Sequence, residues 1–279
     1  MAFRRIEYIL ILAFLVLNAF LFHALFEQNQ AQGLEDQRQS QSRTIEAEMQ
    51  AADVSAGNLS EEEVSLPFMA GETENRLAEQ ANKLKHQDIR IGNNERLFSH
   101  LDKPLDLRGL SDTTTADAFA QQALSRLNDF KNSDAMLYGK HYDFAFYNPQ
   151  KKVIAFYQNG HEGRPIIDGS GEIFFHLDDN YHVESYEQSY VENTMPQGED
   201  RQLISEKQAV ENLYLYNELP SHAEVLSTAL GYRTNLLLDN LFLYKPVWLV
   251  YIRNKDSETK ILYVDAINGT IIQTQNNAS

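Results

Sequence analysis

The sequence predicts an α+β fold in which antiparallel sheets and packed helices form repeated units behind one transmembrane helix. Three observations lead to this prediction. Residues 111–195 contain a helical period followed by about four strand-like runs, and residues 196–279 show the same order. Near the start of the chain, residues 6–26 form a predominantly apolar stretch, and the nineteen residues from Tyr8 to Phe26 carry no formal charge.

The apolar stretch 6–26 is long enough to cross a hydrocarbon core of about 30 Å as a helix. Arg4 and Arg5 precede it, whereas the polar run after it has no basic residue before Arg38. The positive-inside rule therefore predicts a cytoplasmic tip at residues 1–5 and an extracellular C-terminal domain. A cleaved signal peptide would have a shorter apolar region that ends in small residues. We therefore expect a retained single-pass anchor in the cell membrane.

Residues 27–48 are polar and rich in Gln, Glu and Ser, which predicts a helical continuation of the anchor that ends in a polar linker. A membrane-proximal coiled coil is the alternative, but apolar residues are too sparse for regular heptads. Residues 49–110 follow as a membrane-proximal region, in which two helix-like runs each lead to a short strand.

Residues 111–195 form the first expected helix-plus-sheet unit. Ala123, Leu127 and Phe130 continue an apolar stripe from Phe119 at helical spacing, and runs with strand-like alternation follow. Aromatic residues cluster around the first of these runs, and they could be core residues or could line a ligand groove. They are Tyr138, Tyr142, Phe144, Phe146, Phe156 and Tyr157.

Residues 196–279 form the second unit. Ser205 is the expected N-cap of a helix that turns Ala209, Leu213 and Tyr216 inward. Four strand-like runs follow this helix. Residues 236–244, LLLDNLFLY, are unusually apolar, and they predict either a buried strand pair or an exposed patch for a partner.

Composition excludes several functions. The formal net charge of −16 argues against binding to nucleic acid and against a broad electrostatic grip on an anionic membrane. The chain has no cysteine, so disulfides, thiol nucleophiles and Cys-ligated zinc are excluded. No motif for nucleotide binding or nucleophilic catalysis occurs. Glu172, His176 and Asp178 could serve chemistry, but a solvated polar face explains them better. We therefore expect no catalytic, metal or cofactor site.

The most specific stretch is residues 245–273, KPVWLVYIRNKDSETKILYVDAINGTIIQ. Its order of Pro-x-Trp, strand, polar hairpin and Tyr-Val-Asp-Ala resembles the end of PepSY-like modules, where such a hairpin closes a small sheet. Asp265 can bind backbone N–H groups of its own turn, and Asn268-Gly269 suits a tight connection. A structural role therefore explains these residues.

The whole layout resembles the YycI (WalI) family of low-GC Gram-positive bacteria. The related YycH proteins are similar but generally longer. The resemblance implies a non-enzymatic regulator of cell-wall homeostasis that binds the sensor histidine kinase YycG (WalK) of a two-component system. It would act with a YycH-type co-regulator, through membrane helices and ectodomains. The second hypothesis is a PepSY-type inhibitor or chaperone of an exported hydrolase. The third and least favoured hypothesis is an anchored cell-wall enzyme.

Asn18 is the strongly polar side chain near the middle of the anchor. An amide within hydrocarbon needs a hydrogen-bonding partner, either on its own helix or on a neighbouring helix. We expect the second, so that one face of the anchor contacts helices of the kinase or of its co-regulator. That face carries Phe14, Leu15, Asn18, Leu21, Phe22 and Leu25.

Overall fold

The structure is a computed structural model. It describes residues 41–72, 77–92, 96–107, 116–238, 241–256 and 259–273. The predicted cytoplasmic tip 1–5 and anchor 6–26 lie outside these ranges. No helix within them is long and apolar enough to span a bilayer.

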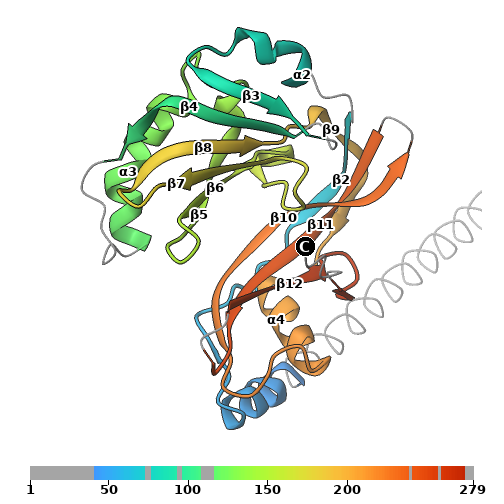
Figure 1. Cartoon of the computed structure of the whole chain (residues 1–279). Coiled ribbons are helices and arrows are strands. Elements are labelled where there is room, and N and C mark those ends of the chain that lie inside the picture. The colour runs from blue at the N-terminus through green and yellow to red at the C-terminus, as the bar shows by residue number, and fades with distance from the viewer. Residues whose placement is uncertain are drawn as a thin grey trace, which may run out of the picture.

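Two sheets organise these residues, and their strand pairs are antiparallel except for the short parallel pair β1–β10 (Figure 1). The first sheet follows the order β3 (Gln87–Ile91), β4 (Leu97–Asp106), β8 (His182–Gln188), β7 (Glu172–Leu177), β6 (Val153–Gln158) and β5 (Tyr142–Asn148). The second follows the order β1 (Ser55–Ala56), β10 (Glu224–Leu238), β11 (Leu241–Arg253), β12 (Thr259–Asp265) and β13 (Ile271–Ile272), and β2 (Ser65–Glu72) joins β11 to β9 (Glu192–Gln202). The helices are α2 (Leu77–Gln80), α3 (Ala116–Lys131), α4 (Glu206–Leu215) and an N-terminal helix over residues 41–51. The α+β class and the antiparallel sheets are therefore confirmed.

Helix α3 covers one face of the first sheet (Figure 1). Ala123 and Leu127 are fully buried in this core, together with Phe156 from β6 and Phe175 from β7. Phe130 packs edge-on against Phe175, with ring centroids 6.3 Å apart. The predicted order of one helix followed by four antiparallel strands, β5 to β8, is confirmed here.

Helix α4 begins with the capping box that Ser205 predicts. The Ser205 hydroxyl accepts a hydrogen bond from the Gln208 backbone N–H at 3.2 Å, and the Gln208 side chain accepts one from the Ser205 N–H at 2.9 Å. Ala209 and Leu213 are buried as predicted. The prediction for Tyr216 was wrong: its side chain is 61% exposed, because the helix ends at Leu215 and Tyr216 is the C-cap.

Helix α4 and the strands beside it form the core of the second sheet, called the second core here. The N-terminal helix packs against this core, so residues 41–48 do not form part of a polar linker. Ile45 and Met49, one turn apart, are both buried in the cluster around α4. Lys207 of α4 lies 2.7 Å from Glu46, which ties the two helices together. The segment expected as a linker, 27–48, thus contributes its last eight residues to the packed domain.

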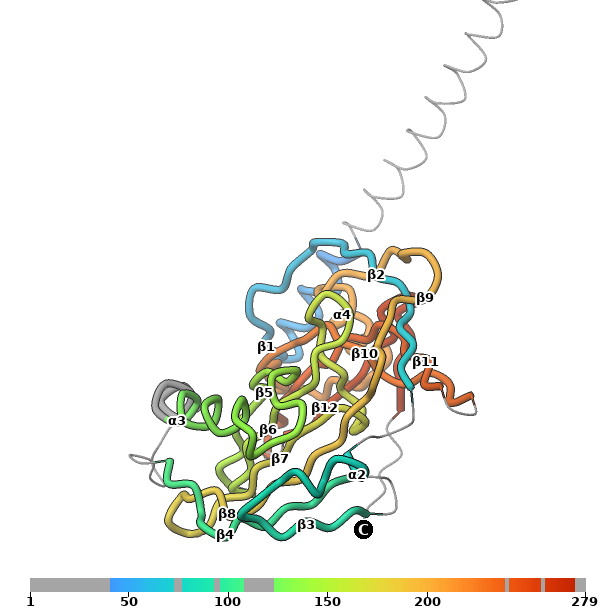
Figure 2. Tube along the Cα trace, turned by 90° about the horizontal axis from the view of Figure 1, so that it is seen from above, coloured from blue at the N-terminus to red at the C-terminus, as the bar shows by residue number. Residues whose placement is uncertain are grey.

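The second sheet is formed by two separate parts of the chain, and the first sheet is formed by the residues between them. Strand β2 leaves the second sheet and β9 returns antiparallel beside it (Figure 2). Every strand of the first sheet lies between these two in the sequence. Residues 49–110 therefore divide between the two sheets, and the expected domain boundaries remain predictions.

Candidate interaction sites

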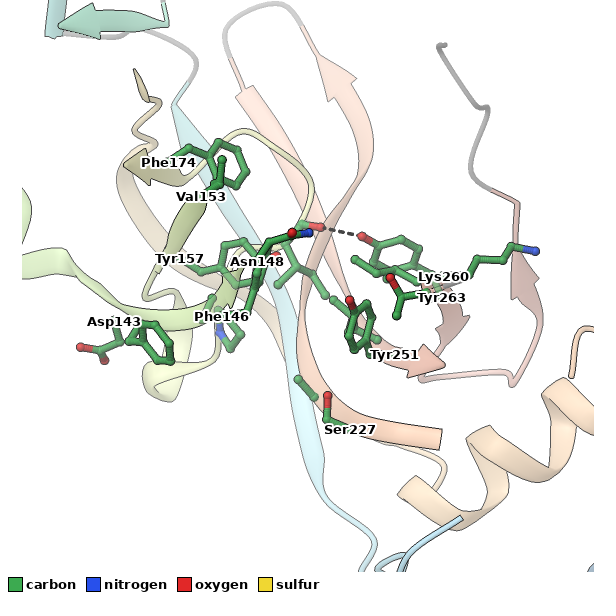
Figure 3. Close-up of a pocket in the computed structure, with 18 of the residues that line it drawn as sticks. Asp143, Phe146, Asn148, Val153, Tyr157, Phe174, Ser227, Tyr251, Lys260 and Tyr263 are labelled. Atoms are coloured by element: carbon green, nitrogen blue, oxygen red, sulfur yellow. Dashed lines mark hydrogen bonds between the residues drawn. The ribbon is translucent and has the colours of Figure 1, made fainter. Parts of the chain in front are cut away.

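A groove of about 980 Å³ lies between the two sheets (Figure 3). Each sheet contributes aromatic or aliphatic side chains to its walls. These are Phe146, Tyr157 and Phe174 from the first sheet and Leu249, Tyr251 and Tyr263 from the second. Both walls can therefore contact an apolar or planar group.

The rim of the groove is polar. Lys151 and Lys260 lie at the groove, and the Asn159 side chain donates a hydrogen bond to the Asp143 carboxylate at 2.7 Å. The rim can orient a ligand by hydrogen bonds and charge, whereas the walls supply contact area.

The aromatic run of the sequence splits between core and groove. Tyr142 and Phe156 are fully buried in the core of the first sheet, whereas Phe146 and Tyr157 line the groove. Side chains of neighbouring residues in a strand point to opposite faces, so Phe156 points into the core and Tyr157 points into the groove. The run therefore supplies both core residues and residues that line a groove, and ligand binding in that groove stays a prediction.

The loop between β6 and β7, residues 159–171, connects the two sheets and is called the bridging loop here. Its Ile167 N–H donates to the Tyr232 carbonyl of β10 at 2.9 Å, and the Tyr232 N–H donates to the Pro165 carbonyl at 2.7 Å. The Asp168 carboxylate accepts from the Thr234 N–H at 2.7 Å. A Cβ at Gly231 would lie only 2.7 Å from the Pro165 carbonyl oxygen, so glycine permits this close contact.

Glu172 follows the bridging loop, and its side chain is only 11% exposed. The pKa of Glu172 is raised to about 7, mainly by burial and to a lesser extent by the nearby Asp168 and Glu187 carboxylates, while the Arg96 guanidinium opposes the rise. Arg96 lies 3.1 Å from Glu187 and 4.0 Å from Glu172. The junction of the two sheets therefore contains a carboxyl group that ionises near neutral pH.

The structure does not bring Glu172, His176 and Asp178 into one site. His176 lies 3.1 Å from Glu187. The Asp178 carboxylate instead closes the β7–β8 turn by accepting backbone N–H groups of Asn180 at 2.8 Å and His182 at 2.9 Å. Within the described ranges, no group of three or more His, Asp or Glu side chains is arranged to hold a metal ion.

The apolar run 236–244 forms the end of the β10–β11 hairpin. Four leucines there are exposed, and they are called the leucine tip here: Leu236 at 46%, Leu237 at 56%, Leu238 at 49% and Leu241 at 37%. Of the two alternatives that the sequence left open, the structure shows the exposed patch for these residues. The exposed patch could be recognised in the sequence because the strands on either side of the turn lack the alternation of apolar and polar residues that is typical of an edge strand.

Asp265 has the structural role that its motif predicts. One carboxylate oxygen accepts the Ile267 N–H at 2.9 Å, and the other lies 2.8 Å from the Lys245 ammonium. Gly269 has φ +74°, and its N–H donates to the Asp265 carbonyl at 2.8 Å. The hairpin between β12 and β13 is thus held by hydrogen bonds within its own turn.

The predicted transmembrane contact face lies outside the residues that the structure describes. It therefore stays a prediction for all six of its members: Phe14, Leu15, Asn18, Leu21, Phe22 and Leu25.

Comparisons with known proteins identify the family. Among solved structures, an uncharacterized protein from Eubacterium rectale shares 12% identity at a TM-score of 0.44, covering 80% of this chain and 89% of its own. The C-terminal domain of Bacillus megaterium YpeB shares 15% identity at a TM-score of 0.37, covering 73% of this chain and 100% of its own. No curated protein matches significantly. The family model described as "YycI protein" matches residues 34–267, most of the chain. The chain therefore belongs to the YycI family.

Proposed function

We propose that this chain is a non-enzymatic, single-pass membrane protein that binds and modulates the sensor histidine kinase YycG (WalK), together with a YycH-type co-regulator. The observation that carries the proposal is the family match over residues 34–267. The apolar stretch 6–26 with Arg4 and Arg5 before it supports a cytoplasmic N-terminus and an extracellular domain.

The geometry of the described domain suits a binding function. It offers two surfaces that could contact another molecule, the inter-sheet groove and the leucine tip. The residues that could have served catalysis have structural partners instead. Asp178 closes a turn, and His176 lies 3.1 Å from Glu187, which also pairs with Arg96.

The decisive experiment is co-purification from solubilised membranes. The tagged full-length chain is co-expressed with the kinase and the YycH-type protein, and a fusion of residues 1–40 to an unrelated exported domain serves as control. The kinase and the co-regulator should be retained by the full chain. If neither is retained at matched expression, or an exported hydrolase is retained in their place, the proposal is wrong.

Asn18→Leu tests the membrane part of the assembly. The substitution makes the span more apolar, so it should preserve insertion but remove a hydrogen bond between helices of ~0.6–2 kcal/mol. Ala13→Leu is the matched control, because position 13 lies about 140° around the helix from position 18. The measurement is crosslinking between full-length proteins at matched expression. Equal crosslinking of both variants and the wild type, with loss on deleting the ectodomain, would place recognition outside the membrane.

A further inference from the structure

Three residues of the leucine tip, Leu236–Leu238, lie on β10 at a free edge of the second sheet, whereas Leu241 lies on β11 and pairs with Glu72 of β2. Strand β10 pairs with β11 along its length. Among the described residues, its other side pairs with β1 at Glu224–Val225 and contacts the bridging loop, through a bridge from Tyr232 to Ile166 and a hydrogen bond from the Thr234 N–H to the Asp168 carboxylate. Beyond Tyr232, no strand within the described ranges pairs with that side of β10. Exposed edges usually carry charges or proline because a free apolar edge is open to pairing with other chains.

Both faces of the free edge are apolar. In the hairpin register, Leu236 pairs with Leu243, Leu237 with Phe242 and Leu238 with Leu241. Because side chains alternate along a strand, Leu236 and Leu238 share one face and Leu237 lies on the other. A strand added to this edge would therefore meet apolar side chains above and below the sheet, as well as the edge of the backbone.

The size of the patch indicates what kind of partner it suits. A stable complex of free proteins usually buries about 800 Å² on each partner, and four half-exposed leucines supply less than that. A small patch is sufficient when both proteins are anchored in one membrane, because tethering raises their effective concentration to the millimolar range.

The net charge of the chain further limits which molecules could bind the leucine tip. The chain carries a formal charge of −16, so a second copy would bring the same charge and be repelled. A bilayer that contains anionic lipids would also be repelled. A neutral or basic protein meets no such repulsion.

We propose that the leucine tip binds a separate protein anchored in the same membrane, by adding an apolar strand of that protein to the free edge of β10. The surface around that strand is neutral or basic. The identity of the partner rests on the proposed function, which offers the kinase and its YycH-type co-regulator.

Photo-crosslinking in membranes tests the contact. A photoreactive phenylalanine replaces Leu237 in the full-length chain, which is co-expressed with the tagged kinase and co-regulator. Ile91 is the matched control position, because it is 40% exposed and lies on β3, an edge strand of the other sheet. The crosslink should form from position 237 to one of the two tagged proteins and be absent from position 91. Crosslinks only to a second copy or to lipid would overturn the proposal.

Charge substitution tests the affinity. Leu236→Asp with Leu238→Asp should reduce the amount of co-purified partner by about 10–100-fold, the range expected for losing buried leucines. Ile91→Asp should leave it unchanged, and far-UV circular dichroism should match the wild type for both. An intact complex in the double variant would overturn the inference alone. No complex even with the wild-type chain would refute the proposed function as well.

Discussion

Replacing Glu172 by Gln should remove a pH-dependent loss of stability. Burial raises the pKa of this carboxyl group from 4.5 to about 7. The folded chain therefore binds the proton more tightly than the unfolded chain, so the free energy of unfolding falls as the pH rises between these two values. The full difference corresponds to about 3 kcal/mol, reached above the folded pKa. The variant lacks this cost because glutamine stays neutral and keeps nearly the same shape.

Urea unfolding of the purified full-length chain in a mild detergent measures the effect. The chain has one tryptophan, Trp248, whose indole donates to the Ile204 carbonyl at 2.9 Å, so its fluorescence reports on the second core. The wild type and Glu172→Gln should be about equally stable near pH 4, and the variant should be more stable by up to about 3 kcal/mol at pH 8. Glu199→Gln, at an exposed position of β9, should show no such trend. A constant difference across this range, or a less stable variant at pH 8, would refute the reasoning.

Three further predictions concern other parts of the chain. Asp265→Ala should lower the free energy of unfolding by about 1–3 kcal/mol, because it leaves turn N–H groups and the Lys245 ammonium without their acceptor, and an unchanged urea midpoint would contradict this. Gly231→Ala should destabilise by about 1–3 kcal/mol through its clash with the bridging loop, whereas Gly57→Ala, with nothing within 4 Å of its Cβ, should not, and equal effects would argue against the close contact. Protease added to intact protoplasts should digest residues 41–273, and full protection of this domain would refute the proposed topology.

Local signals predicted the local structure well. Ser205 followed three residues later by Gln208 is a sufficient signal for a capping box, and Asp265 close before Gly269 is one for a tight turn. The order of one helix and four strands was also visible in each half, because apolar periods of 3.6 and 2 depend only on neighbouring residues.

Contacts between residues far apart in the chain leave no comparable pattern in the sequence. Ser55 pairs with Glu224 in the second sheet, and no short window of sequence contains both residues. The burial of Glu172 could not be predicted either, because it depends on how the bridging loop packs against β10. The groove has the same origin: Tyr157 and Tyr251 belong to different sheets, and only the packing of those sheets brings them together.

The nesting of the first sheet within the second has a consequence for synthesis. A chain that leaves the ribosome with its N-terminus first can complete the first sheet from contiguous residues. Strands β1 and β2 can pair with β10 and β11 only after those later strands have been synthesised. The groove needs β12, and the leucine tip needs the β10–β11 hairpin, so both surfaces form only when nearly the whole chain is present. A truncated product would therefore lack both surfaces, and only finished molecules would compete for a partner.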